Sequence, residues 1–175
     1  EKILGALPGS NCGACGKAGC AGLAEAIAVG DASLTGCPAG GEEVSNKIAD
    51  ILGVEKESVL RKVARVRCGG GTRATDKFIY KGDKTCRGAL LVAKGQKLCG
   101  FACLGFGDCV KVCPFDAIHM GDDGIPKVDH LKCTACGKCV VACPREIISL
   151  EYVQEKYYVK CLSKEKAQLV RKACK

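Results

Sequence analysis

The chain contains no tryptophan, and only four phenylalanines and four tyrosines occur among its 175 residues. Aromatic side chains supply much of the apolar surface that a protein core buries, so this composition leaves little material for a large core. It also provides too few rings for stacking on single-stranded nucleic acid, and we expect no nucleic acid as a partner. Another source of stability must therefore complete the fold.

Long hydrophobic runs are missing as well. No apolar stretch approaches the roughly 20 residues of a membrane-spanning helix, and the first eight residues do not resemble a signal peptide. No glycine-rich dinucleotide fingerprint follows a strand, because Gly69–Gly71 lacks the spacing and the helix, and no nucleophile stands beside a base. These absences predict a soluble chain with no substrate pocket of its own, and they leave its status as an enzyme open.

Cysteine, in contrast, is abundant. Sixteen cysteines would suggest disulfides in a small secreted protein, but the C-x2-C steps favour a reducing compartment and metal ligation. Zinc ribbons also contain C-x2-C pairs, so zinc is the main alternative to iron–sulfur clusters. The formal charge of +8 fits clusters, since three four-thiolate [4Fe–4S] units would reduce it to roughly +2.

The strongest motif is Cys133-x2-Cys136-x2-Cys139-x3-Cys143-Pro144, which has the thiolate spacing of a [4Fe–4S] ferredoxin. In two-cluster ferredoxins the fourth cysteine of such a run binds the other cluster, so the motif predicts a second one. The matching step is Cys113-Pro114, about 30 residues upstream. Cross-ligation predicts a cluster held by Cys133, Cys136, Cys139 and Cys113, and it assigns Cys143 to the other cluster.

The upstream half departs from this repeat, because Phe106 stands where the second ligand should be. Cys99 lies four residues before Cys103 and is the preferred substitute. The alternative is a three-iron cluster or another ligand arrangement. The predicted ligands are Cys99, Cys103, Cys109 and Cys143.

A separate set near the amino terminus reads Cys12-x2-Cys15-x4-Cys20-x16-Cys37-Pro38. Small residues surround its first three members, which lets the backbone pass close to a cluster and leaves amides free to point at sulfur. We expect a third [4Fe–4S] cluster here, with a zinc-stapled loop as the alternative. Its ligands are Cys12, Cys15, Cys20 and Cys37.

Four cysteines remain after these assignments: Cys68, Cys86, Cys161 and Cys174. Cys86-x12-Cys99 and Cys161-x12-Cys174 share one spacing, which suggests that a repeat extends beyond the two ferredoxin halves. Free buried cysteines, a fourth cluster on these four residues, zinc and disulfides all stay open.

The pattern of elements predicts an α+β fold. A small helical four-cysteine cluster domain is followed by a ferredoxin-like two-[4Fe–4S] domain with short hairpins. Apolar spacing predicts helices between Cys20 and Gly30 and from Glu42 to Gly53. Val59, Val63 and Val66 would continue in a second helix or in a helix that runs into a strand.

Two further short elements are predicted, a strand and turn at residues 78–82 and a hairpin at residues 119–128 with His119 on the surface. The expected domains are residues 1–66, the amino-terminal [4Fe–4S] domain; residues 67–98, a connecting segment; residues 99–151, the two-[4Fe–4S] domain; and residues 152–175, a truncated carboxy-terminal segment.

Taken together, these motifs resemble RnfB, the B-type iron–sulfur subunit of the Rnf complex. The similarity covers nearly the whole chain and is carried by residues 13–20, 37–43, 105–118 and 132–139. The amino-terminal pattern alone also occurs in other iron–sulfur proteins, such as corrinoid-carrier subunits, so the order of both motifs favours Rnf. Family members usually start with a membrane-anchoring helix, absent here, and many continue with further clusters after the position of Cys174.

The resemblance implies an electron-relay subunit of a membrane-bound, ion-translocating ferredoxin:NAD oxidoreductase. Its implied partners are ferredoxin as electron donor, the other Rnf subunits, and the membrane through the missing anchor. It would lie on the cytoplasmic face of the cell membrane, and the chain itself would be a soluble fragment. The alternative is the iron–sulfur subunit of a soluble redox enzyme, or a free polyferredoxin.

Overall fold

The computed structural model describes residues 1–56 and 60–175. Its contacts divide the chain into two units. The first contains residues 1–63 and 134–136, and the second contains residues 64–133 and 137–175. Val59, at which the sequence predicts a continuing helix, lies outside the described residues. Within the described residues, no helix is long and apolar enough to cross a bilayer.

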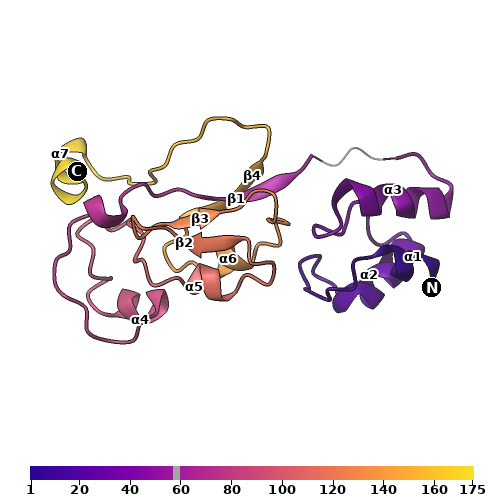
Figure 1. Ribbon diagram of the computed structural model, residues 1–175, viewed down its shortest axis with the longest axis horizontal. Helices are drawn as coiled ribbons and strands as arrows, with labels where there is room; N and C mark the ends of the chain where they lie inside the picture. The colour runs from indigo at the N-terminus through magenta and orange to yellow at the C-terminus, as the bar shows by residue number, and fades with distance from the viewer. Residues whose placement is uncertain (57–59) are drawn as a thin grey trace. The chain divides into compact units, whose positions relative to one another are not determined.

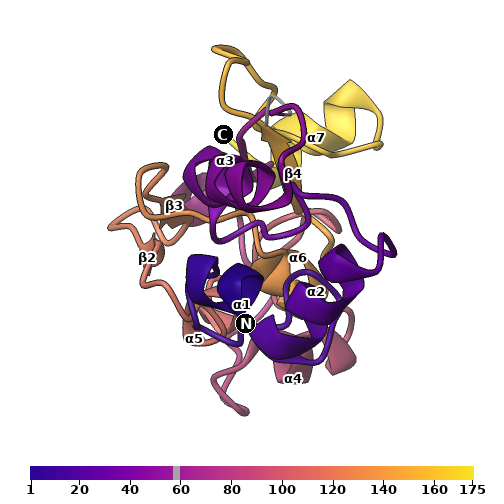
Figure 2. The ribbon, with the colours of Figure 1, turned by 90° about the vertical axis from the view of Figure 1, so that its right-hand side faces the viewer.

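The first unit contains three helices, α1 (Lys2–Ala6), α2 (Gly19–Ala28) and α3 (Gly41–Leu52) (Figure 1). Helix α1 contacts both of the others, which can be followed in Figure 2. The positions of α2 and α3 confirm the two helices predicted from apolar spacing. Gly53 ends α3 in the left-handed conformation, with a φ of 68° that favours glycine.

An apolar cluster packs these helices together. Leu23 and Ile27 of α2 pack in it with Ile48 of α3, whose side chain is fully buried. These residues recur on one face of each helix, and burial of that face stabilises a helix more than its intrinsic propensity does. Cys20 and Cys37 belong to the same apolar cluster, so these two cysteines are part of the core of this unit.

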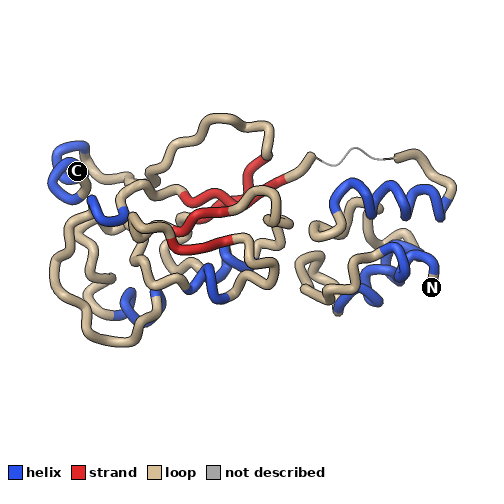
Figure 3. Tube along the Cα trace, in the orientation of Figure 1, coloured by secondary structure: helices blue, strands red, loops and turns tan. Residues whose placement is uncertain are grey.

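Loops make up most of the second unit, as the tan tube in Figure 3 shows. Its helical segments are all short. They are the 3-10 turn η1 (Gly71–Arg73) and the helices α4 (Cys86–Leu91), α5 (Asp108–Lys111), α6 (Lys138–Ala142) and α7 (Ala167–Ala173).

Two pairs of strands complete the second unit. Strand β2 (Ile118–Met120) pairs antiparallel with β3 (Pro126–Val128), which confirms the predicted hairpin. Strand β1 (Lys62–Val66), whose residues 64–66 belong to this unit, pairs with β4 (Ile148–Tyr152). Residues 62–66 therefore form the strand that was one alternative for this stretch, and not a second helix.

Two parts of the second unit repeat one another at an interval of about 30 residues. Gly107 and Gly137, both left-handed, begin the short helices α5 and α6. Asp116 and Glu146 follow the two Cys-Pro steps, and both have positive φ values, of 48° and 54°. Helix α5 also contacts α6. The sequence repeat is thus present in the backbone conformation.

The strand predicted at residues 78–82 is absent, and this segment forms a loop. Ile79 is 85% exposed, and the ring of Tyr80 packs against Phe106 with 5.5 Å between the ring centroids. A strand requires a neighbour that pairs with its backbone, and this segment is not part of either strand pair. The apolar residues that suggested a strand serve instead as one packing contact and one exposed side chain.

Candidate metal centres

The first unit brings the four amino-terminal cysteines together. Cys20 and Cys37 are buried in its apolar cluster, and the half-buried Cys15 packs against the same cluster. Burial raises the pKa of the Cys37 thiol, and the neighbouring Cys20 and Cys12 raise it further. These four cysteines thus lie near one another in the first unit, and their role as ligands of one cluster stays a prediction.

The backbone around these cysteines is arranged to meet sulfur. Amides of residues 39–40 hydrogen-bond to the Cys37 thiol, which opposes the rise in its pKa caused by burial. Oδ1 of Asn11 accepts a hydrogen bond from the amide of Cys20 at 2.8 Å and closes the loop. A Cβ on Gly19 would lie 2.7 Å from that oxygen, so this close approach requires glycine. Amides that point at sulfur stabilise thiolates bound to iron.

Similar hydrogen bonds occur in the ferredoxin-like run. The amide of Ala117 donates to Sγ of Cys113, and the amide of Ala64 donates to Sγ of Cys133, both at 3.4 Å. Cys139 lies in the first turn of α6, in the second unit with Cys113 and Cys133. Cys136 lies in the part of the loop that belongs to the first unit.

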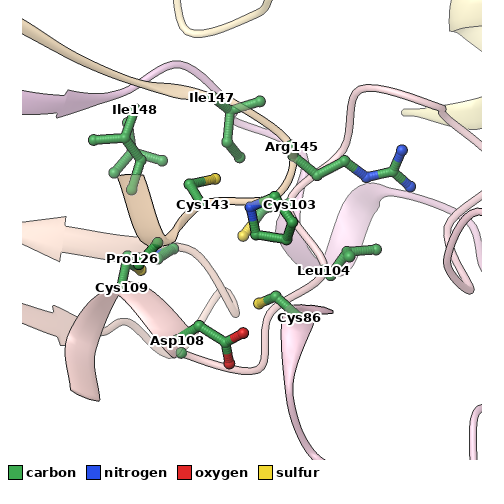
Figure 4. A pocket seen from close by; sticks show the side chains of 14 residues that line it. Cys86, Cys103, Leu104, Asp108, Cys109, Pro126, Cys143, Arg145, Ile147 and Ile148 are labelled. Atoms are coloured by element: carbon green, nitrogen blue, oxygen red, sulfur yellow. The ribbon is translucent and has the colours of Figure 1, made fainter. Parts of the chain in front are cut away.

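A cavity in the second unit is lined by four cysteines from separate segments (Figure 4). Apolar side chains, among them Leu104 and Ile148, complete its wall. The free space is only about 20 Å³, so a four-iron core would have to push the walls outward as it binds. The four cysteines are Cys86, Cys103, Cys109 and Cys143.

Cys86 lines the cavity with Cys103, Cys109 and Cys143, the three cysteines that we predicted to share a cluster with Cys99. The thiol of Cys86 accepts hydrogen bonds from the backbone of Asp108 and Phe106. It therefore lies beside Phe106, which stands where the repeat has a cysteine. Helix α4 begins at Cys86, because the Thr85 side chain caps it by accepting from the amide of Gly88 at 3.0 Å. Cys99, which we predicted from its closeness in sequence to Cys103, is not among the residues that line this cavity.

The buried thiols of this cavity are poor acids. Burial raises the pKa of Cys103 and of Cys109 to about 12, and it also raises the pKa of Cys86. The neighbouring sulfurs add to this effect, because each disfavours a second negative charge nearby. Raised pKa values favour the neutral thiol, so binding of a cluster by these groups as thiolates would release protons.

Arg145 is the basic residue that lines this cavity. Its guanidinium donates to the carbonyl of Gly100, and to that of Lys94 at 2.6 Å. Burial lowers the pKa of Arg145, while negative charge on Cys99, Cys143 and Cys103 would favour its charged form. A fixed positive charge beside Cys143-Pro144 complements the negative charge of a thiolate-bound cluster.

Cys99 faces a different cavity in the same unit, where Cys68, Cys161 and Cys174 also contribute to the wall. The four cysteines that line this cavity differ in one member from the four that had no assigned cluster in the sequence, because Cys99 stands in place of Cys86. The shared x12 spacing did not predict this arrangement. Cys161 and Cys174 line the same cavity, whereas Cys86 and Cys99 line different ones.

Histidine does not join the cysteine sets described so far. His119 lies in β2, is exposed, and has its Nδ1 3.6 Å from Oδ1 of Asp116, which agrees with its predicted surface position. Among residues 1–56 and 60–175, no three Cys, His, Asp or Glu side chains are close enough together to hold one metal ion.

Two family models match the chain. The model described as "Putative Fe-S cluster" matches residues 7–39, which contain the amino-terminal cysteine set. The model described as "4Fe-4S dicluster domain" matches residues 99–148. The chain is thus a mixed helix and strand protein with an iron–sulfur domain followed by a [4Fe–4S] dicluster domain, in the predicted order.

Curated relatives align with almost the whole chain. The B-type subunit of the Na⁺-translocating ferredoxin:NAD⁺ oxidoreductase complex of Acetobacterium woodii is 45% identical over 98% of this chain and 52% of its own length. The B-type subunit of the ion-translocating oxidoreductase complex of Methanosarcina acetivorans is 40% identical over 99% of this chain and 66% of its own. The B-type subunit of the proton-translocating ferredoxin:NAD⁺ oxidoreductase complex of Clostridium ljungdahlii is 43% identical over 96% and 60%. The chain therefore spans about half to two thirds of these relatives.

Proposed function

This chain belongs to the RnfB family, and from that membership we propose that it is an electron relay. It accepts electrons from reduced ferredoxin and passes them to other subunits of an ion-translocating ferredoxin:NAD oxidoreductase. The names of the relatives support this function over a free polyferredoxin or a subunit of a soluble redox enzyme. The chain works on the cytoplasmic face of the membrane, and NAD chemistry and ion transport belong to its partners.

Three [4Fe–4S] clusters carry the electrons in this proposal, two of them in a ferredoxin-like arrangement. When bound, such clusters supply one-electron transfer at potentials set by their surroundings. The amino-terminal cluster is held by Cys12, Cys15, Cys20 and Cys37. The second is held by Cys113, Cys133, Cys136 and Cys139, and the third by Cys86, Cys103, Cys109 and Cys143.

The observation that carries the proposal is the third set, because its four thiols, from three segments of the chain, line one cavity. Cys109 and Cys143 come from the two halves of the backbone repeat, which is the cross-ligation of two-cluster ferredoxins. The chain's own groups hold and tune the site. Amides donate to the thiol of Cys86, and Arg145 contributes a positive charge.

The function is tested by mixing the iron-loaded chain anaerobically with reduced ferredoxin and following the chain's cluster signals by freeze-quench EPR. We expect the clusters to become reduced within the mixing experiment, with no NAD⁺ reduced by the chain alone. A loaded chain that takes no electrons from ferredoxin, yet is reduced by dithionite, would contradict the proposal. NADH formed by the chain alone would favour a redox enzyme over a relay.

A further inference from the structure

Four cysteines outside the three proposed ligand sets line one cavity of about 260 Å³ in the second unit. They come from segments far apart in the sequence, before η1, before α5, after β4 and after α7. We propose that these four thiolates bind a fourth [4Fe–4S] cluster. The ligands are Cys68, Cys99, Cys161 and Cys174.

Backbone hydrogen bonds join these segments. Cys68 forms an antiparallel bridge with Cys161, and Ala74 forms one with Cys174. Thr75 joins two of the segments, because its amide donates to the carbonyl of Ala173 at 2.9 Å and its carbonyl accepts from the amide of Leu98 at 2.8 Å. The path of residues 68–76 therefore brings three cysteine-bearing segments to one place.

The loop after Cys68 passes close to the sulfurs. A Cβ built on Gly70 would lie 3.2 Å from Sγ of Cys174 and 3.7 Å from Sγ of Cys68. The first distance is shorter than a comfortable van der Waals contact, so a side chain here would push against a ligand. Glycine leaves the backbone free to approach a cluster closely, as it does at other anion-binding loops. The neighbouring Gly69 has only ordinary contacts at 3.4 Å or more.

The wall of this cavity combines apolar surface with positive charge. Phe101, Ala102 and Val170 exclude water from one part of it, and Arg67, Arg73 and Lys160 contribute the basic side chains. Arg67 is fixed by Glu151 at 2.6 Å. An oxidised four-thiolate cluster carries a net charge of about −2. The positive charges of Arg73 and Lys160 complement it, whereas the charge of Arg67 is balanced by Glu151.

The spacing of the four thiols favours a cluster over a single zinc ion, because among residues 1–56 and 60–175 no three such side chains are close enough together to hold one metal ion. Thiolates bind zinc at about 2.3 Å and close around it, whereas the four cysteines here border a space of about 260 Å³. Two of them, Cys68 and Cys99, are buried, while Cys161 is exposed. The exposed ligand leaves one side of the site open to solvent.

The test is a count of iron and acid-labile sulfide in the anaerobically loaded chain. We expect about 16 irons per chain, and about 12 in the double variant Cys161→Ala/Cys174→Ala, because only the fourth cluster should disappear. Ser163→Ala is the matched control. Ser163 lines the same cavity but is not a ligand, so the count should not change.

A second pair of variants keeps all cysteines. Gly70→Ala places a methyl group against the ligand sulfurs and should lower the iron count toward that of the double variant, whereas Gly69→Ala should match the parent chain. EPR of the remaining clusters shows whether the other sites are intact.

The proposal fails if the fully loaded parent chain holds about 12 irons, or if the double variant loses none. One zinc per chain that disappears in the double variant would also overturn it. The count requires no ferredoxin, so the fourth site and the relay function can fail separately.

Discussion

The backbone amide of Cys103 donates a hydrogen bond to Sγ of Cys68, with 3.4 Å between nitrogen and sulfur. Cys103 lines the cavity that also contains Cys86, and Cys68 lines the cavity that contains Cys99. One residue therefore contributes its thiol to one proposed cluster and its amide to a ligand of the other. The two clusters would be neighbours joined by a single hydrogen bond.

We predict that these two clusters interact magnetically when both are reduced. Paramagnetic centres joined through one residue are close enough for their spins to couple, so the EPR spectrum of the fully reduced chain should contain broadened, split signals. The Cys161→Ala/Cys174→Ala variant should show narrower signals from the remaining clusters. A spectrum that equals the sum of isolated clusters, in a chain loaded with about 16 irons, would rule out this proximity.

Cys86 and Cys99 line different cavities, so their serine variants should damage different clusters. Cys86→Ser should damage the cluster that also uses Cys103, Cys109 and Cys143, converting it to a three-iron form with the loss of about one iron. Cys99→Ser should leave that cluster intact and damage the fourth one. EPR spectra of the two variants show which cluster each one has lost. If Cys99→Ser damaged the cluster of Cys103, Cys109 and Cys143 and Cys86→Ser did not, Cys99 would be the ligand of that cluster.

Arg145 should set the reduction potential of the cluster beside it. Its positive charge stabilises the more negative reduced state, so Arg145→Gln should lower the potential by roughly tens of millivolts. Arg145→Lys keeps the charge but not the forked donors to Gly100 and Lys94, and should stay near the parent value. Redox titration followed by EPR makes the measurement. Equal shifts in both variants would assign the effect to lost hydrogen bonds.

Gly71 should not tolerate alanine. Its φ is 49°, and a Cβ there would overlap the carbonyl oxygen of Asp123, which accepts a hydrogen bond from the amide of Thr72 at 2.9 Å. We expect Gly71→Ala to reduce the free energy of unfolding by about 2 kcal/mol or more, through backbone strain and overpacking. Denaturant titration of the loaded chain measures this. Gly69→Ala is the control, and equal stability of both variants would contradict the role of this contact.

Removal of iron should unfold much of the second unit. This unit is mostly loop, its apolar clusters are small, and cysteines form part of them. Cluster binding and folding therefore stabilise the same structure. Circular dichroism should show loss of ordered structure in the apo chain, with no sharp thermal transition. Native spectra and cooperative unfolding without iron would show that the protein core is sufficient.

The local part of each predicted site follows from spacing along the sequence. The C-x2-C steps, the Cys-Pro steps and the 30-residue repeat predicted the two regular ligand runs, because neighbouring ligands on one tight loop are constrained by backbone length alone. The helices α2 and α3 and the hairpin β2–β3 followed from apolar periodicity and turn residues for the same reason.

Only the tertiary structure shows which distant cysteines line the same cavity. Cys86 and Cys99 are both buried, and the shared x12 spacing of Cys86–Cys99 and Cys161–Cys174 suggested a repeat. The path of the chain places Cys86 and Cys99 in different cavities. The backbone of Asp108 and Phe106 hydrogen-bonds to Cys86, whereas backbone hydrogen bonds of residues 68–76 place Cys68 near Cys161 and Cys174. Contacts between remote segments depend on how all the loops pack together, and no spacing along the sequence records that.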